Sequence, residues 1–379
     1  MVVWRECKLG EVVNLKRGYD LPHTDRVPGP FPIVSSSGIT DHHAEAKVKG
    51  PGVITGRYGT LGEVFFVEED FWPLNTSLYV QDFKGNDPRF ISYLLRQLNF
   101  GTQNAAGAVP GVNRNHLHAI EVRVPPLPVQ RRIAGILSAY DDLIENSQRR
   151  IRILEGVARA LYREWFVEYR FPGHEKLPRV ASPLGDIPKG WEVKPLSEVA
   201  EVNCAQISPR HAPEEVHYID IASVSPGQID AVTTHLFSEA PGRARRIVHH
   251  GDVLWSCVRP NRRSHALVMY PEPDTIASTG FAVLTAKAVP YTFLYAATIT
   301  DEFVGYLTNN ASGAAYPAVT ASTFEKAELI VPPPDLLRRF GEVTVPLAEE
   351  AHFLGAQIKN LRKTRDLLLP RLLATRGSN

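Results

Sequence analysis

The sequence has few cysteines, no long apolar run and no signal-like start, and each absence argues against one class of protein. Only 3 cysteines occur in 379 residues, and they are scattered, so we expect neither a disulfide framework nor a cysteine metal site. No apolar run reaches the roughly 18 residues of a membrane-spanning helix. The start, Met1–Glu6, has no charged region followed by an apolar stretch, so we expect no secretory signal. A reducing, cytoplasmic location without membrane partners fits these lacks.

Motifs for catalysis are lacking as well. An adenine methyltransferase needs an acid or amide before Pro-Pro-aromatic, but both Pro-Pro steps here follow a valine, Val124 or Val331. No glycine-rich turn resembles a dinucleotide or S-adenosylmethionine loop, and no Walker A motif occurs. The pairs His42-His43 and His249-His250 do not indicate a metal site, because adjacent side chains point in different directions. We therefore expect no catalytic residues, no metal and no cofactor in this chain.

Net charge is also small, with a formal value of +1. A protein that coats DNA non-specifically is usually far more basic. One stretch nevertheless gathers positive side chains, and their number favours a polyanionic partner over separately solvated arginines. The stretch contains Arg243, Arg245, Arg246, His249, His250, Arg259, Arg262, Arg263 and His265.

The sequence contains an internal repeat, which indicates a duplicated architecture. Pro110 aligns with Pro317, and the same offset holds without a gap until Leu161 meets Leu368. A looser repeat aligns Trp4 and the residues after it with the residues from Trp191. The two offsets differ, so the halves match at their ends and have diverged in their middles.

Each half begins with a segment rich in glycine, proline and β-branched residues, which predicts a mixed α/β (α+β) globular domain. The predicted boundaries are 1–126 and 174–333 for the two domains, with helical segments at 127–173 and 334–379. Within the domains we predict short strands at 53–55, 63–67, 253–255 and 281–284, turns at 35–38 and 226–227, and helices at 90–98 and 291–307.

A long helix is predicted after each proline-marked strand end. Mostly apolar residues recur there at alternating steps of three and four, which is a coiled-coil seam. Arg365 interrupts the second seam, and we expect it to extend its charge outwards over its apolar stem. The first seam contains Leu137, Tyr140, Ile144, Ser147, Ile151, Leu154, Ala158, Leu161 and Trp165, and the second contains Leu347, Ala351, Leu354, Ile358, Leu361, Arg365, Leu368 and Leu372.

Two such helices at equivalent repeat positions favour pairing over two separate amphipathic surface helices. The order of the segments then makes the pair antiparallel and relates the halves by a pseudo-two-fold axis. A helix of ~35 residues spans about 50 Å at 1.5 Å per residue, and one turn of B-DNA is ~34 Å. The sequence thus predicts a spacer that lets two domains reach two half-sites about a turn apart.

The sequence resembles the specificity subunits of type I restriction-modification systems over essentially its whole length. Residues 127–137, running on to 161–166, are similar to the central conserved region of that family, and 331–373 to its distal conserved region. Gly56-Arg57-Tyr58-Gly59-Thr60-Leu61-Gly62 resembles a glycine-arginine loop of target recognition domains. Residues 70–77 fit the segment that follows this loop.

The resemblance implies two target recognition domains that read the halves of a bipartite site in double-stranded DNA. It also implies that the helices dock two methyltransferase subunits, which restriction subunits with translocase activity join. Those partners, and not this chain, would bind S-adenosylmethionine, ATP and Mg²⁺. The second half departs from the pattern: Leu337 replaces Gln130, and the Gly56–Gly62 loop has no close copy, with Val258–Asn261 at the approximate equivalent.

Candidate DNA contacts follow from side-chain chemistry, because arginine reads guanine, asparagine reads adenine and basic groups neutralise phosphate. Arg57 and Tyr58 lead, since flanking glycines let a loop approach phosphates; the alternative is a tight hairpin with a solvated arginine. Asn113 and its neighbours could instead cap a helix. The full candidate set is Arg57, Tyr58, Asn113, Arg114, Arg259, Asn261, Arg262, Arg263 and Tyr316.

Two other functions stay open at this point. A fused nuclease or methyltransferase would carry the chemistry itself, but the chain shows no motif for it. A two-headed adaptor for protein partners is compatible with a coiled coil, while the arginine- and asparagine-bearing loops favour nucleic acid. Measured DNA affinity would separate the adaptor from a DNA-binding subunit.

Overall fold

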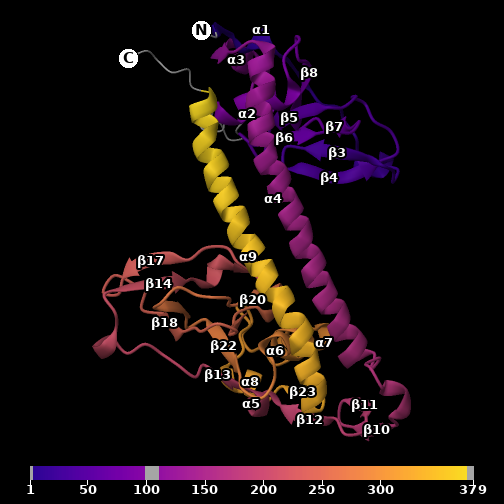
Figure 1. Ribbon diagram of the computed structural model, residues 1–379, viewed down its shortest axis with the longest axis vertical. Helices are drawn as coiled ribbons and strands as arrows, with labels where there is room; N and C mark the ends of the chain where they lie inside the picture. Colours follow the sequence, from indigo (N-terminus) through magenta and orange to yellow (C-terminus); the bar gives the residue numbers. More distant parts are fainter. Residues whose placement is uncertain (1–2, 99–110, 374–379) are drawn as a thin grey trace. The chain divides into compact units, whose positions relative to one another are not determined.

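The computed structural model describes residues 3–98 and 111–373. It divides into two compact units, of which unit 1 comprises Met1–Ser147 and Gln357–Asn379, and unit 2 comprises Gln148–Ala356 (Figure 1). Each unit holds one mixed α/β domain together with part of each of two long helices. Pro110, used above to align the halves, and residues 374–379 of the last predicted segment lie outside the described residues.

The domain of unit 1 is built on a four-stranded antiparallel sheet and a smaller three-stranded sheet. The larger sheet has the order β2 (Asn14–Arg17), β8 (Ser77–Asp82), β5 (Gly52–Gly56), β6 (Val64–Val67), and the smaller has the order β4 (Gly38–His43), β3 (Phe31–Ser35), β7 (Trp72–Pro73). β1 (Arg5–Lys8) pairs with β9 (Glu121–Val124). The helices are α1 (Leu9–Val12), η1 (His23–Asp25), α2 (Pro88–Gln97) and α3 (Arg114–Ala119).

The domain of unit 2 repeats this plan with a larger second sheet. Its first sheet has the order β13 (Ala200–Val202), β22 (Phe281–Ala286), β19 (Val253–Ser256), β20 (His265–Leu267), and its second the order β17 (Thr233–Leu236), β14 (Glu215–Ile219), β21 (Thr275–Ser278), β18 (Ala244–Ile247). Three further pairs are β12 (Glu192–Pro195) with β23 (Glu328–Val331), β15 (Val224–Ser225) with β16 (Gln228–Ile229), and β10 (Arg179–Ser182) with β11 (Gly185–Pro188).

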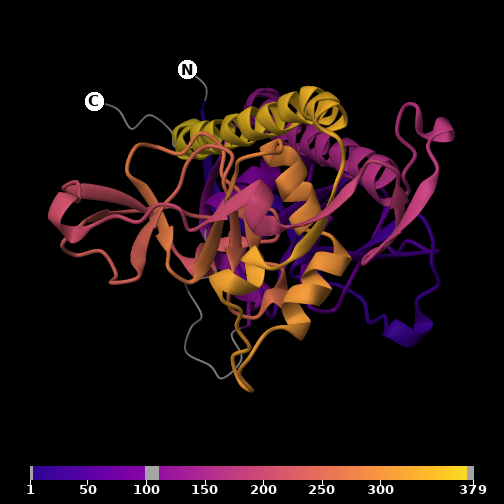
Figure 2. The same ribbon diagram turned by 90° about the horizontal axis from the view of Figure 1, so that it is seen from below.

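The remaining helices of unit 2 are short, and its β10–β11 hairpin and its β17 strand lie on opposite sides of the unit (Figure 2). The α-helices are α5 (Leu196–Val199), α6 (Tyr291–Thr298), α7 (Asp301–Asn309) and α8 (Ala321–Glu325). The 3-10 helices are η4 (His174–Lys176), η5 (Pro209–His211), η6 (Ile221–Ser223) and η7 (Pro260–Arg262).

The predicted repeat is confirmed, because the two domains share their topology. The order β2-β8-β5-β6 corresponds to β13-β22-β19-β20, and the closing pair β1-β9 corresponds to β12-β23. The short helix after the first closing strand also recurs, as α1 and α5. The fold class is therefore mixed α/β with an internal duplication.

Most local predictions are confirmed, and the helical segment predicted at 291–307 is helical with one break. The chain forms α6 and α7 there, with Thr300 in extended conformation between them. The Thr300 hydroxyl accepts a hydrogen bond from the backbone of Phe303 at 3.2 Å, which caps α7. A threonine that bonds the backbone in this way starts a new helix in preference to continuing the old one.

The long helices are α4 (Leu127–Tyr162, 36 residues), which continues as the π-helix η3 (Arg163–Val167), and α9 (Pro334–Leu373, 40 residues). Every predicted seam residue is buried or partly buried, so the predicted seams are confirmed. Within unit 1 Asp141 of α4 meets Arg365 of α9, and within unit 2 Arg150 meets Glu350. In each unit the two helices run antiparallel, as predicted (Figure 1).

The two domains are attached to their helices by different chemistry. In unit 1 buried Gln130 donates to the Asn86 side chain and the Pro125 carbonyl, and accepts from the Asp87 backbone at 2.9 Å. At the repeat-equivalent position of unit 2, Leu337 lies in a core of aromatic side chains. The change from Gln130 to Leu337 therefore exchanges a hydrogen-bonded junction for an apolar one.

Candidate nucleic-acid interface

The loop that joins β5 to β6 is held in place by backbone hydrogen bonds. The backbone N–H groups of Arg57 and Tyr58 both donate to the Thr76 carbonyl, at 2.9 and 3.1 Å. A β-carbon at Gly56 would lie 1.8 Å from the Thr60 carbonyl oxygen, so the turn requires glycine there. The glycines flanking Arg57 and Tyr58 thus serve the shape of the loop.

Arg57 extends over the ring of Tyr58. The centre of its guanidinium lies 4.6 Å from the ring centre, and its Nη2 donates to the Tyr58 hydroxyl at 3.4 Å. Tyr58 is 40 % exposed. Among residues 3–98 and 111–373 no carboxylate pairs with Arg57. The cation-π contact holds an arginine whose remaining N–H donors face no acid of the described chain.

Gly111 makes room for this arrangement. A β-carbon at Gly111 would lie 2.5 Å from a ring carbon of Tyr58. Gly111 and Tyr58 form an isolated β-bridge, and the next residue, Val112, donates its backbone N–H to the Arg57 carbonyl at 2.9 Å. The position of the Tyr58 ring therefore depends on a glycine far away in the sequence.

Unit 2 builds a similar loop after β19. Arg259 and Arg263, at the two ends of η7, have left-handed backbone conformation with φ of 51° and 56°. The Arg259 side chain donates from Nη2 to the Ala315 carbonyl at 3.1 Å, and its guanidinium lies 4.6 Å from the centre of the Tyr316 ring. Tyr316 is 69 % exposed. Asn261 and Arg262 are exposed on η7 beside this pair.

The two loops occupy equivalent places in the two domains. Each follows the second central strand, β5 or β19, and each pairs with a segment at the repeat-equivalent position, as Tyr58 with Gly111 and Val258 with Ala318. Each presents an arginine stacked on a tyrosine. The second loop is hard to find in the sequence because Arg259 and Tyr316 are distant in the chain, whereas Arg57 and Tyr58 are adjacent.

Two candidate residues have other partners. Asn113 caps α3, because its side chain accepts from the backbone of Asn115 at 2.9 Å, so the alternative of a helix cap is what the structure shows. Arg114 follows as the first residue of α3 and is exposed. Arg263 forms an ion pair with Asp301. The structure thus brings together Arg57 with Tyr58 and Arg259 with Tyr316, and it engages Asn113 and Arg263 elsewhere.

The basic stretch from Arg243 to His265 is divided between two sheets. Arg243 pairs with Asp220 at 2.6 Å, and Arg245 lies over the ring of Phe237, both beside the sheet that contains β18. Arg259 and Arg262 instead follow β19 in the other sheet. The basic residues of this stretch are therefore shared between two sheets, because consecutive strands of this domain belong to different sheets.

A polar group beside the first loop was not selected from the sequence. Asn75 precedes Thr76, which anchors the loop, and its side chain donates to Asp20, which also pairs with Arg17 at 3.1 Å. Asn75 lies within the 70–77 segment, whose resemblance to the family carries no role for this residue. Only the fold shows that the segment of Asn75 and Thr76 holds the backbone of Arg57.

His265 is buried in unit 2, with its ring 4.9 Å from that of Trp255 and its Nδ1 3.4 Å from the Tyr295 hydroxyl. Burial, helped by the charge of Arg263, lowers its pKa from 6.5 to about 4. The unfolded chain binds this proton more readily, so the free energy of unfolding should fall as pH drops from 6.5 towards 4. Between pH 7 and pH 5 we expect a loss of about 2 kcal/mol.

Urea unfolding of the chain at pH 7 and pH 5, followed by tryptophan fluorescence, measures this loss. His265→Gln should remove it, so that the variant is less sensitive to acid than the original chain. Equal pH dependence in the two proteins would show that His265 does not titrate as its surroundings imply.

The described residues offer no obvious site for a metal ion. Within 3–98 and 111–373 no group of three or more histidine, cysteine, aspartate or glutamate side chains could hold one. In the two histidine pairs, His43 Nδ1 contacts the Val27 backbone and the ring of His250 lies 4.3 Å from that of Tyr270. None of the helices in these ranges has the length and apolarity that crossing a membrane requires.

Comparison with known proteins identifies the domains that carry the two loops. A family model described as the type I restriction modification DNA specificity domain matches residues 1–155 and 188–335. The chain belongs to this family. One specificity domain contains the loop of Arg57 and Tyr58, and the other contains the loop of Arg259 and Tyr316.

Related specificity-domain proteins include two curated subunits. The HindI specificity subunit of Haemophilus influenzae is 22 % identical, over 98 % of this chain and 98 % of that protein. The MjaIX specificity subunit of Methanocaldococcus jannaschii is 24 % identical over 70 % of this chain. The matched part covers 62 % of that relative's own length. The crystal structure of a type I S subunit from M. genitalium shares the fold, with a TM-score of 0.68 at 14 % identity, over 99 % of this chain and 97 % of that one.

Proposed function

We propose that this chain is the DNA-recognition subunit of a type I restriction-modification complex. Each specificity domain reads one half of a bipartite site in double-stranded DNA. The observation that carries the proposal is the occurrence of the same arginine-on-tyrosine loop in both domains, at equivalent positions of the repeat. Arginine and tyrosine presented on glycine- or proline-shaped loops suit base edges and phosphates.

We assign the contacts in two sets. In domain 1 Arg57 and Tyr58 lead, with Arg114 as a phosphate contact and with the amide nitrogen of Asn113. In domain 2 the contacts come from Arg259, Asn261, Arg262 and Tyr316. Arg263 contributes to the local potential while its guanidinium stays with Asp301. Asn261 is the one candidate in domain 2 that suits adenine.

The long helices are proposed to act as the spacer between the target recognition domains, residues 1–126 and 174–333. The spacer segments are then 127–173 and 334–379. A 36-residue α4 is about 54 Å long at 1.5 Å per residue, which exceeds a turn of B-DNA. A helix of that length fits a target whose halves are split by undefined bases.

The outer face of α4 is proposed to bind the methyltransferase subunits. In unit 1 Ile136 and Leu143 are exposed one heptad apart, and in unit 2 Ile153 and Val157 are exposed one turn apart. These residues lie outside the seam, on a helix that is already paired. Exposed apolar side chains in such rows suit another helix. One such place in each unit fits two methyltransferase subunits.

Catalysis is proposed to belong to the partners. The methyltransferase subunits would bind S-adenosylmethionine, and the restriction subunits would use ATP and Mg²⁺ for translocation and cleavage. This chain would recognise the target sequence on DNA and provide the surface on which the complex assembles. Its work on host DNA places it in the cytoplasm.

Co-expression with a partner methyltransferase subunit, followed by sequencing of the host DNA for methylated adenines, tests the proposal. We expect new methylation in two short defined sequences separated by undefined bases. A stable complex that neither methylates nor binds DNA would contradict the proposed function. It would favour a protein adaptor, which the exposed apolar face of α4 supports.

A further inference from the structure

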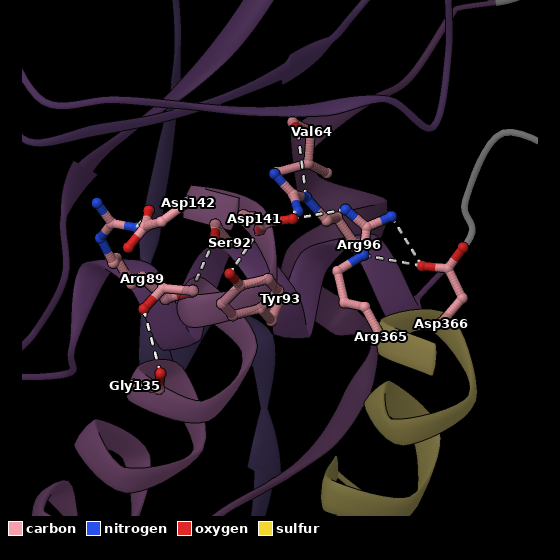
Figure 3. Close-up of polar contacts among 11 residues, drawn as sticks. Val64, Arg89, Ser92, Tyr93, Arg96, Gly135, Asp141, Asp142, Arg365 and Asp366 are labelled. Atoms are coloured by element: carbon pink, nitrogen blue, oxygen red, sulfur yellow. Dashed lines mark hydrogen bonds and ion pairs between the residues drawn. The ribbon is translucent and has the colours of Figure 1, made fainter. Parts of the chain in front are cut away.

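We infer that Asp141 is a positioning residue, which fixes the angle of the first recognition domain on the long helices and thereby sets the spacer length that the complex accepts. The inference rests on the proposed function and adds a determinant that touches no DNA. Three elements of unit 1 meet at this carboxylate, namely α2 of the domain, α4 and α9 (Figure 3).

The contacts of Asp141 are short and directional. The Tyr93 hydroxyl donates to one carboxylate oxygen at 2.6 Å, and Arg96 Nη1 reaches the same oxygen at 3.3 Å. Arg365 Nη1 of α9 donates to the other oxygen at 2.5 Å. Tyr93 and Arg96 both belong to α2, so the carboxylate ties that helix of the domain to both long helices.

The Asp141 contacts are charged and partly shielded from water. The Asp141 side chain is 26 % exposed and that of Arg365 22 %. Burial alone would raise the pKa of Asp141, but hydrogen bonds from Tyr93 and Arg365, together with the charge of Arg96, hold it below its usual value. Asp141 is therefore ionised at neutral pH, and removing its charge leaves two arginines facing each other. Arg365, expected above to extend into water, is instead held by Asp141 and by Asp366.

The Asp141 contacts lead towards the DNA-binding loop. Arg96 also donates from Nε to the Val64 carbonyl at 3.4 Å, and Val64 begins β6. The loop that carries Arg57 and Tyr58 joins β5 to β6. A change in the angle of α2 on α4 therefore moves the strand that ends this loop.

The second domain joins α9 by a different set of contacts. The repeat places Ala348 at the position of Asp141, and α6 meets α9 through a hydrogen bond between the buried hydroxyls of Thr292 and Thr344 at 2.7 Å. Aromatic side chains fill the core of that junction, and at its exposed surface the Tyr270 hydroxyl donates to Glu349 of α9 at 2.6 Å. Hydrogen bonds to one ionised carboxylate define an angle more sharply than apolar packing does. The Asp141 contacts are partly buried and include two arginines, whereas the Tyr270–Glu349 contact is exposed, so we place the spacer requirement on the side of domain 1.

The test uses the chain assembled with its methyltransferase partners and DNA that carries the preferred site. Two further DNAs have the undefined spacer lengthened or shortened by one base pair. The readout is the ratio of methylation rates on the preferred and altered spacers. Asp141→Asn should lower this ratio about tenfold, the typical effect of losing a hydrogen bond to a charged group. Asp142→Asn is the matched control. Asp142 is the next residue, its side chain is 64 % exposed, and its ion pair with Arg89 is long, at 3.7 Å.

A general loss of stability would lower the rates on all spacers together and leave the ratio unchanged. An unchanged ratio in folded Asp141→Asn therefore overturns the inference. If that variant does not fold, Tyr93→Phe removes a single hydrogen bond, and it should lower the ratio severalfold; an unchanged ratio there overturns the inference equally. If the original complex itself shows no preferred spacer, the proposed function has failed and not merely the role of Asp141.

Discussion

Arg259→Ala lowers the affinity of the assembled complex for its target by about 10- to 100-fold and relaxes the base preference in one half-site. A bidentate arginine contributes about 1–3 kcal/mol of discrimination between bases. The Arg259 side chain is held for such a contact by the Tyr316 ring and the Ala315 carbonyl. Arg57→Ala has the same effect on the other half-site. Titration of DNA variants at one fixed salt concentration measures both, since phosphate contacts depend on salt.

Arg243→Ala is the control for these two substitutions. It removes the same charge from domain 2, but Arg243 is paired with Asp220 beside the second sheet. We expect its effect to be less than about threefold, as for an exposed ion pair. Unchanged affinity in both Arg57→Ala and Arg259→Ala would remove the two loops from the interface. Loss of preference in both half-sites from one substitution would contradict the division of labour between the domains.

Phe166→Ala should destabilise unit 2 by about 3–5 kcal/mol, the usual loss when a buried phenylalanine is truncated. Phe166 is 4 % exposed, and its ring lies 4.9 Å from that of Phe340 and 5.0 Å from that of Phe293. These rings join η3, α9 and α6, so the substitution opens a cavity where domain 2 meets the helices. We expect Tm to fall by roughly 10 °C, measured by thermal unfolding with tryptophan fluorescence.

Val167→Ala is the matched control for this cavity. Val167 is the next residue of η3 and is 45 % exposed, so its truncation should cost less than about 0.5 kcal/mol. Equal shifts of Tm in the two variants would show that the aromatic core does not hold the domain on its helices.

The long helices could be predicted from the sequence because burial on one side of a helix is periodic. Each seam position from Leu137 to Trp165 is shielded in the structure, and the repeat placed the second seam on α9. The break at Thr300 was missed because residues 291–307 are apolar on both sides of it. The signal was present, since a threonine followed by Asp301 and Glu302 is a typical helix start.

Contacts between distant residues account for what the sequence could not provide. Arg57 can be predicted because its tyrosine is adjacent, but the stacking of Arg259 on Tyr316 depends on a fold that brings η7 to the segment before α8. The seam pattern predicts that Arg365 extends into solvent, since its partner, Asp141, lies on the other long helix and is distant in the sequence. The basic stretch looked continuous because a sequence does not show which strands share a sheet.

Selection from a pool of random double-stranded DNA by the chain assembled with its methyltransferase partners tests the central claim most directly. We expect two short enriched sequences at one fixed separation, with no base preference in the stretch that separates them. We also expect Arg57→Ala to weaken the base preference in one of these sequences and Arg259→Ala to weaken it in the other. A single continuous enriched sequence, or no enrichment by a complex that assembles normally, would contradict recognition by two separate domains.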